Sequence, residues 1–271
     1  MGCASSTGVF QSIPDKYNSV EEVQKALRQA GLQSSDLIIA VDFTESNLWK
    51  GEKTFEGRSL HYIDKTGRVT NPYQTVISAI TRVFELFDDD DSIPAFGYGG
   101  YPERPPAERY FPFVEGQGCE FDEILQRYFA IASTMELNSS SSFVPIIHEA
   151  MKMANKSRRY HILIIISDGH VDDPGIARRA IVEASEYPLS IVMVGVGDGP
   201  WTLMTEFDDK LPERRFDNFQ FVNYNTIPRG NLDNPDGGFA MQALMEIPEQ
   251  YNTIRELGLI KNQRRRRYCG H

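Results

Sequence analysis

The sequence has few cysteines and no long apolar run, and each absence excludes a class of protein. Its three cysteines, Cys3, Cys119 and Cys269, are widely spaced among 271 residues, which fits neither a disulfide framework nor a zinc site. The longest apolar run, residues 162–166, is far shorter than the roughly 20 residues that a membrane-spanning helix needs. Because no apolar leader follows Met1, we expect an intracellular protein.

Basic residues are also scarce, with 28 Lys and Arg against 38 Asp and Glu. The resulting net charge of −10 argues against nucleic acid as the main partner. The charge is uneven, because residues 255–271 carry a net +5 and leave −15 for the rest. Residues 261–271 therefore form a basic tail on an acidic body. Its run of four arginines suggests contact with an anionic membrane surface, although such runs are also import signals or solvated ends. These residues are Arg264, Arg265, Arg266 and Arg267.

Residues 1–16 are small and polar, without apolar periodicity, and we interpret them as a flexible arm. The first six fit the pattern M-G-x-x-x-[ST], with Ser6 at its last position. The pattern predicts myristoylation of Gly2, and the adjacent Cys3 is placed for palmitoylation. Two acyl chains hold a protein stably at a bilayer, whereas one does so only marginally. The alternative is a chance match, since the motif is short.

Between these ends, strand and helix patterns alternate in a single domain, residues 17–260. The predicted helices are residues 20–29, 72–87, 121–132, 143–155, 176–187 and 239–257, and the predicted strands are 37–41, 93–96, 162–166, 189–196 and 219–222. Such alternation is typical of an α/β fold with a doubly wound, mostly parallel sheet flanked by helices. We also expect one short antiparallel edge strand, with residues 58–63 as a candidate.

Two of the predicted strands end in an aspartate, Asp42 and Asp168. Carboxyl ends of parallel strands meet at one edge of the sheet, where ligands collect. Alternate residues after the first strand, Thr44 and Ser46, add hydroxyl oxygens, and a run of serines at 139–142 precedes a predicted helix. Carboxylates and hydroxyls suit Mg²⁺ or Mn²⁺ and do not suit zinc. The alternative is that the aspartates only cap turns.

The motifs DFTES, SSSSF and IISDG resemble the metal-ion-dependent adhesion site of von Willebrand factor A domains, written D-x-S-x-S, then T, then D. Longer segments, among them VDFTESN, IPAFGYGG and PLSIVMVGVGDGPW, resemble the A domain of copines and of plant RING-type ubiquitin ligases that carry a copine domain. The resemblance covers residues 17–260. It implies a metal site formed by Asp42, Thr44, Ser46, Ser141 and Asp168. Thr44 and Ser141 replace the serine and the threonine of the general pattern, and both keep an oxygen.

The resemblance implies a non-catalytic module that binds a protein through its cation, whose coordination an acidic side chain of the partner completes. The paired C2 domains of copines and the cysteine and histidine spacing of a RING are absent from the sequence, so we do not expect ligase activity. We expect the acylated arm to replace the C2 domains as the means of attachment to the cytoplasmic face of a membrane.

Two alternatives to this function stay open. One is a phosphohydrolase with Asp42 as the nucleophile and Asp168 and Asp172 holding Mg²⁺. Haloacid-dehalogenase phosphatases have an aspartate two residues after the nucleophile, whereas this chain has Thr44 there. The other is a scaffold that associates with itself, in which an acidic residue of one copy binds the cation of another.

Overall fold

The sheet of this protein has six strands. The computed structural model describes residues 20–30, 32, 35–84, 92–100, 109–116, 118–137, 142–227 and 236–261. The strands are β1 (Asp36–Asp42), β2 (Ala95–Tyr98), β3 (Tyr110–Pro112), β4 (His161–Ser167), β5 (Leu189–Gly195) and β6 (Phe219–Asn223), in the spatial order β3-β2-β1-β4-β5-β6. All neighbours pair in parallel except β2 and β3, which are antiparallel. The expected fold class, mostly parallel with one antiparallel edge strand, is confirmed.

The central strands have long apolar runs and are buried along nearly their whole length because helices cover both faces of the sheet. Successive side chains of a strand point to opposite faces, and the buried residues of β1 divide accordingly. Leu37, Ile39 and Val41 belong to one apolar core, whereas Ile38 and Ala40 belong to the other. The structure therefore has one core on each side of the sheet.

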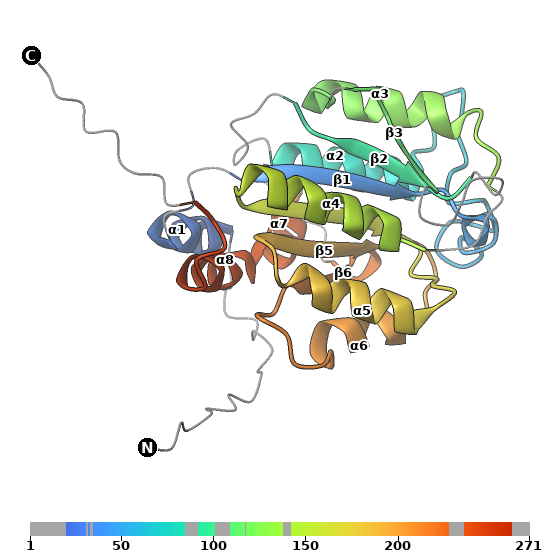
Figure 1. Cartoon of the computed structure of the whole chain (residues 1–271). Coiled ribbons are helices and arrows are strands. Elements are labelled where there is room, and N and C mark those ends of the chain that lie inside the picture. The colour runs from blue at the N-terminus through green and yellow to red at the C-terminus, as the bar shows by residue number, and fades with distance from the viewer. Residues whose placement is uncertain are drawn as a thin grey trace, which may run out of the picture.

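Helices form the outer layers (Figure 1). They are α1 (Val20–Ala30), α2 (Pro72–Phe84), α3 (Phe121–Ala132), α4 (Val144–Ser157), α5 (Pro174–Ala184), α6 (Thr202–Asp209), α7 (Gly237–Leu244) and α8 (Ile247–Glu256), with the short 3₁₀ helices η1 (Glu45–Leu48) and η3 (Tyr224–Thr226). Buried residues of α4, α5 and α6 share one core, and those of α1, α2, α3, α7 and α8 share the other. Among the described residues, none of the helices is long and apolar enough to cross a membrane.

The edge strand is in a different place from the one the sequence suggested. Residues 58–63 form turns and β3 is the antiparallel strand, so the candidate at 58–63 was wrong. The physical reason is that Leu60 and His61 are both buried, whereas a half-buried strand would point consecutive side chains in opposite directions. The amide of Leu60 donates to the carbonyl oxygen of Asn47, which holds this segment against the loop after β1.

The last predicted helix, residues 239–257, is in fact two helices. The helix is interrupted between the end of α7 at Leu244 and the start of α8 at Ile247, and Pro248 lies in the first turn of α8. Proline is tolerated in a first turn but not in a helix interior, because it lacks the N–H group. The helix α6 was not predicted at all. Residues 85–91 and 228–235 lie outside the described residues.

The order of the strands places a topological switch point between β1 and β4. From β1 the chain moves outward to β2 and β3, and it then returns to the other side of β1 with β4. In open α/β sheets, ligands bind outside the carboxyl ends of the strands at such a point. The loops after β1 and β4 therefore occupy the position where the fold favours a site.

Candidate metal centre

The loop after β1 gathers three oxygen-bearing side chains. The backbone amide and the hydroxyl of Thr44 both donate to Oδ1 of Asp42, over 2.9 Å and 2.6 Å. The hydroxyls of Thr44 and Ser46 are 3.2 Å apart. This is an aspartate turn, in which the carboxylate binds the backbone two residues ahead, and η1 follows it directly. The alternate spacing 42, 44, 46 thus brings its oxygens together, as the sequence predicted.

The loop after β4 meets the first loop through Ser167. Its hydroxyl donates to Oδ2 of Asp42 over 2.8 Å. Asp168 comes next and is buried, and its Oδ1 accepts the amide of His170 over 2.9 Å. Oδ2 of Asp168 is buried and has no hydrogen-bond partner among the described residues. A buried carboxylate oxygen without a donor is costly, and a cation would relieve that cost.

The electrostatics of the two carboxylates also favour a cation. Burial, and then the charge of Asp168, raise the pKa of Asp42 from 3.8 to about 7, although the hydrogen bonds from Thr44 and Ser167 act in the opposite direction. Neither aspartate forms an ion pair with a lysine or arginine within the described part of the chain. Two carboxylates therefore lie close together without compensating charge.

The donor set fits a hard divalent cation. The described ranges contain no group of three or more His, Cys, Asp or Glu side chains placed to hold a metal, so a cation here would depend on hydroxyl oxygens as well. Asp42, Thr44, Ser46 and Asp168, called the candidate metal site below, supply two carboxylates and two hydroxyls. Hydroxyl and carboxylate oxygens suit Mg²⁺ or Mn²⁺. The proximity of these residues is observed, and their ligation of a metal stays a prediction.

Other predicted site residues lie outside the described residues. They are Gly2, Cys3, Ser139, Ser140, Ser141, Arg264, Arg265, Arg266 and Arg267. Ser142 is described, and its hydroxyl oxygen accepts the amide of Val144, the first residue of α4, over 3.4 Å. The fifth predicted ligand, Ser141, is therefore untested.

A buried histidine that sequence analysis missed supports the loop from behind. His61 is stacked between Phe43 and Tyr73, at centroid distances of 4.7 Å and 4.1 Å. Its Nε2 lies 2.6 Å from the carbonyl oxygen of Asp42, and its Nδ1 lies 2.9 Å from the hydroxyl of Tyr128. Nε2 must donate to the carbonyl, so the neutral ring accepts the Tyr128 hydroxyl at Nδ1. No local pattern in the sequence indicates this role.

The ring of His61 is neutral because it is enclosed. Burial lowers its pKa from 6.5 to about 3, and the contact with the Asp42 carbonyl only partly opposes this shift. The neighbouring residues Tyr73, Asn47 and Thr44 continue the network, since the Tyr73 hydroxyl donates to Oδ1 of Asn47 and the Asn47 amide donates to the Thr44 carbonyl. The aspartate turn is thus fixed by an aromatic and polar cluster beneath it.

Gly99 permits the close approach of the β2 loop to this turn. Its φ is +82°, and a Cβ there would lie 2.8 Å from the Thr44 side chain and 2.9 Å from the Thr44 amide. Both the backbone angle and the space therefore require glycine. We expect Gly99→Ala to cost about 2 kcal/mol of stability and to weaken binding of Mn²⁺, measured by calorimetry, because Thr44 must move.

Gly116 provides the control for that experiment. It also has a positive φ, +71°, but a Cβ there meets no atom within 4 Å. Gly116→Ala should destabilise the fold through backbone strain alone and leave the affinity for Mn²⁺ unchanged. Equal Mn²⁺ affinities in the Gly99 and Gly116 variants would show that Thr44 does not depend on this contact.

The residues needed for a phosphohydrolase are less well placed. Both oxygens of Asp42 accept hydrogen bonds, and its side chain is fully buried, which leaves it poorly exposed for nucleophilic attack. Asp172 is exposed, and its carboxylate lies 3.4 Å from His170. These positions do not favour the enzymatic alternative.

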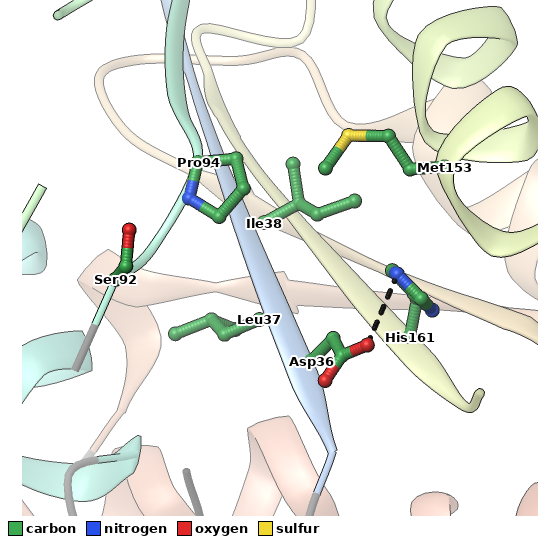
Figure 2. A pocket seen from close by; sticks show the side chains of 7 residues that line it. All are labelled: Asp36, Leu37, Ile38, Ser92, Pro94, Met153 and His161. Carbon is green, nitrogen blue, oxygen red and sulfur yellow. Dashed lines mark ion pairs between the residues drawn. The ribbon is translucent and has the colours of Figure 1, made fainter. Parts of the chain in front are cut away.

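A cleft lies at the opposite, amino edge of the sheet (Figure 2). It has a volume of about 170 Å³ and is lined by Asp36, Leu37, Ile38, Ser92, Pro94, Met153 and His161. The Asp36 carboxylate is 3.4 Å from His161 and 2.6 Å from Arg159. Burial lowers the pKa of His161. This cleft is separate from the candidate metal site, because its residues begin β1 and β4 rather than end them.

Fold and site together define an α/β domain with a rim of carboxylates and hydroxyls at its switch point. The family described as Copine matches residues 59–263. The chain belongs to the copine family. The matched range contains Asp168 but begins after Asp42, Thr44 and Ser46.

The curated relatives include proteins of an animal and of a plant. Copine family protein 2 of Caenorhabditis elegans is 43% identical over 97% of this chain and 3% of its own length. E3 ubiquitin-protein ligase RGLG5 of Arabidopsis thaliana is 44% identical over 93% of this chain and 61% of its own length. E3 ubiquitin-protein ligase RGLG3 of Arabidopsis thaliana is 42% identical over 90% of this chain and 70% of its own length. This chain thus spans about three fifths of RGLG5 and a small part of the nematode protein.

Solved structures of similar shape are distant in sequence. The manganese-loaded TRAP protein of Plasmodium vivax is 14% identical, with a TM-score of 0.49 over 71% of this chain and 70% of that chain. The SpRpn10 VWA domain is 9% identical, with a TM-score of 0.47 over 70% of this chain and 87% of that chain. Similarity at this level carries no information about function.

Proposed function

We propose that this chain is a non-catalytic interaction module that binds Mg²⁺ or Mn²⁺ at its rim and, through the cation, a protein that presents an acidic side chain. Membership of the copine family supports the general role of an interaction module. The proposal depends most on one observation: the buried Asp42 and Asp168 carboxylates share a site and, among the described residues, form no ion pair with a lysine or arginine.

The residues of such a site would have different roles. Asp42 and Asp168 would supply negative charge, and Thr44, Ser46 and, on its sequence alone, Ser141 would supply hydroxyl oxygens. Two carboxylates balance the charge of a divalent cation, and two carboxylates with three hydroxyls would leave one position of an octahedral Mg²⁺ for a further oxygen. On each loop an exposed residue, Glu45 or His170, lies within two positions of the buried candidate ligands, so both loops reach the surface close to the site.

Attachment to a membrane is part of the proposal and depends on sequence alone. The motif at Gly2 and Cys3 would provide acyl chains, and the arginines at 264–267 would add attraction to anionic lipids. Ligase activity is not proposed, although the plant relatives are E3 ubiquitin ligases by name. With three cysteines in total, the sequence cannot supply the ligands of a RING.

A pull-down from cell extract tests the proposal. The intact chain should retain a set of proteins in Mg²⁺ and release it in chelator, and Asp42→Ala should retain none of that set while its circular dichroism stays that of a folded protein. Asp172→Ala is the matched control, because Asp172 is an exposed aspartate of the β4 loop. It should behave like the intact chain.

Two results would contradict the proposal. Retention of the same proteins with and without chelator would remove the cation from the mechanism. Light scattering that shows association of the chain with itself in Mg²⁺, with no foreign protein retained, would favour the scaffold instead.

A further inference from the structure

Three large apolar side chains are exposed in the loop that follows the first candidate ligands. Leu48 is 47% exposed, Trp49 is 55% exposed and Tyr62 is 43% exposed. In the described part of the chain, Phe129 and Ile176 are the other large apolar residues with such exposure. An exposed tryptophan costs solvation free energy that a binding partner can recover. We call Leu48, Trp49 and Tyr62 the apolar rim.

The apolar rim is tied to the candidate metal site by short backbone contacts. The amides of Trp49 and Lys50 both donate to the carbonyl oxygen of Ser46 over 3.2 Å. The Leu60 amide donates to the Asn47 carbonyl over 2.9 Å, which brings the segment of Tyr62 beside that of Leu48. The exposed side chains therefore begin within one turn of a candidate ligand.

The same loop is also held on its far side, where residues 50–54 contact the loop after β5. The ammonium group of Lys50 donates to the Gly199 carbonyl over 2.6 Å. The carboxylate of Asp198 accepts the amides of Lys53 and Thr54 over 2.9 Å and 2.8 Å. Preorganised aromatic side chains lose little entropy on binding, which is why they often dominate interface energetics.

The charge of the loop indicates the class of partner. Residues 45–68 contain five basic and four acidic side chains, so the loop has almost no net charge. An anionic membrane surface attracts clusters of basic residues, and this loop lacks such an excess. A peptide that offers one acidic and one apolar side chain matches the surface better, because the cation attracts the first and the apolar rim attracts the second.

We propose that the apolar rim binds the large apolar side chain of an extended peptide whose acidic side chain, a few residues away, reaches the cation of the candidate metal site. The inference rests on the proposed function, since the acidic anchor needs the cation. It adds the second anchor and hence the sequence preference of the partner: Asp or Glu close to Trp, Phe or Leu.

Selection from a display library of random peptides on the immobilised chain in Mg²⁺ tests the preference. The selected peptides should be enriched in an acidic residue and in a nearby large apolar residue. Enrichment of the acidic residue alone would overturn this inference and leave the proposed function standing. Enrichment of neither would count against both.

Variants then test the residues. A selected peptide, labelled with a fluorophore, should bind Trp49→Ala about tenfold more weakly than the intact chain, as expected for a hot spot. Phe129→Ala removes an aromatic ring that is 41% exposed on α3 and should change the affinity less than about twofold. Both variants should bind Mn²⁺ as the intact chain does. Equal peptide affinities for the two variants would overturn the inference.

Two further measurements distinguish peptide binding from other possible roles of the apolar rim. Sedimentation with phosphatidylserine vesicles that depends on Trp49, combined with peptide binding that does not, would make the surface a lipid contact. Self-association in sedimentation equilibrium that Trp49→Ala removes would make it a contact between copies. Either result would contradict the proposed peptide.

Discussion

Asp42→Asn is expected to stabilise the protein without metal by about 3 kcal/mol at pH 7.5. In chelator the pKa of Asp42 is about 7 in the folded state and 3.8 in the reference state. The folded state therefore binds its proton more tightly, and the stability contributed by this group falls as the pH rises from about 4 to about 7. Asparagine carries no charge, so it escapes the penalty. Its oxygen can still accept from Thr44, and its amide can donate to Ser167.

Chemical denaturation in chelator at several pH values measures this effect. The gain from Asp42→Asn should shrink as the pH falls from about 7 and should vanish below about pH 3, where the carboxyl group is protonated in both states. Addition of Mg²⁺ should stabilise the intact chain, by about 2.7 kcal/mol at a hundredfold excess over its dissociation constant, and should not stabilise the variant. Asp172→Asn, at an exposed position of the β4 loop, should change stability by less than about 0.5 kcal/mol.

A loss of stability in Asp42→Asn at every pH in chelator would contradict the argument. It would mean that hydrogen bonds already compensate the charge of the Asp42 carboxylate. The electrostatic argument for a bound cation would then be lost.

His61→Ala is expected to destabilise the protein by about 3 kcal/mol at pH 7.5. The substitution removes a ring that is stacked between Phe43 and Tyr73, and it deprives the Asp42 carbonyl of its donor. The Tyr128 hydroxyl loses its contact with Nδ1 of His61 and keeps Oδ1 of Asn71, 3.2 Å away. Thermal or chemical denaturation measures the loss. His148→Ala, on the exposed surface of α4, should change stability by less than about 0.5 kcal/mol.

The cost of His61→Ala should depend on pH in a defined direction. The pKa of His61 is about 3 in the folded state and 6.5 in the reference state, so its contribution is complete above pH 6.5 and is lost as the pH falls toward 3. The difference between the intact chain and the variant should therefore shrink by about 2 kcal/mol between pH 7 and pH 5. Asp42 is present in both proteins, so its own titration largely cancels. A difference that is constant with pH would show that His61 titrates normally in the fold.

The pattern of strands and helices could be predicted because it follows from the local periodicity of apolar residues. Short apolar runs such as the one in β4 are typical of buried strands, and their alternation with amphipathic helices indicates a mostly parallel sheet. Two of the errors occurred where long-range contacts decide the local structure. Residues 58–63 are held by the loop after β1, and the short strand β3 exists because it pairs with β2.

The residues that the candidate site brings together could be predicted from the sequence, whereas the residues that support them could not, and ligation of a metal stays a prediction. Alternate spacing after a predicted strand indicates Asp42, Thr44 and Ser46. The position directly after another predicted strand indicates Asp168. His61 is 19 residues from Asp42, and nothing in its neighbours connects the two. Trp49 likewise gives no sign in the sequence that its ring is exposed.

The amino-acid sequence by itself determined the α/β class, the carboxyl edge of the sheet as the position of the candidate site, and the chemical type of the candidate ligands. All three follow from residue type and spacing along one strand or loop. Only the tertiary structure decided which strands are neighbours, how deeply the two aspartates are buried and which ring lies beneath them. The physical reason is that burial raises the pKa of Asp42 and lowers that of His61, and burial depends on residues brought together from distant parts of the chain.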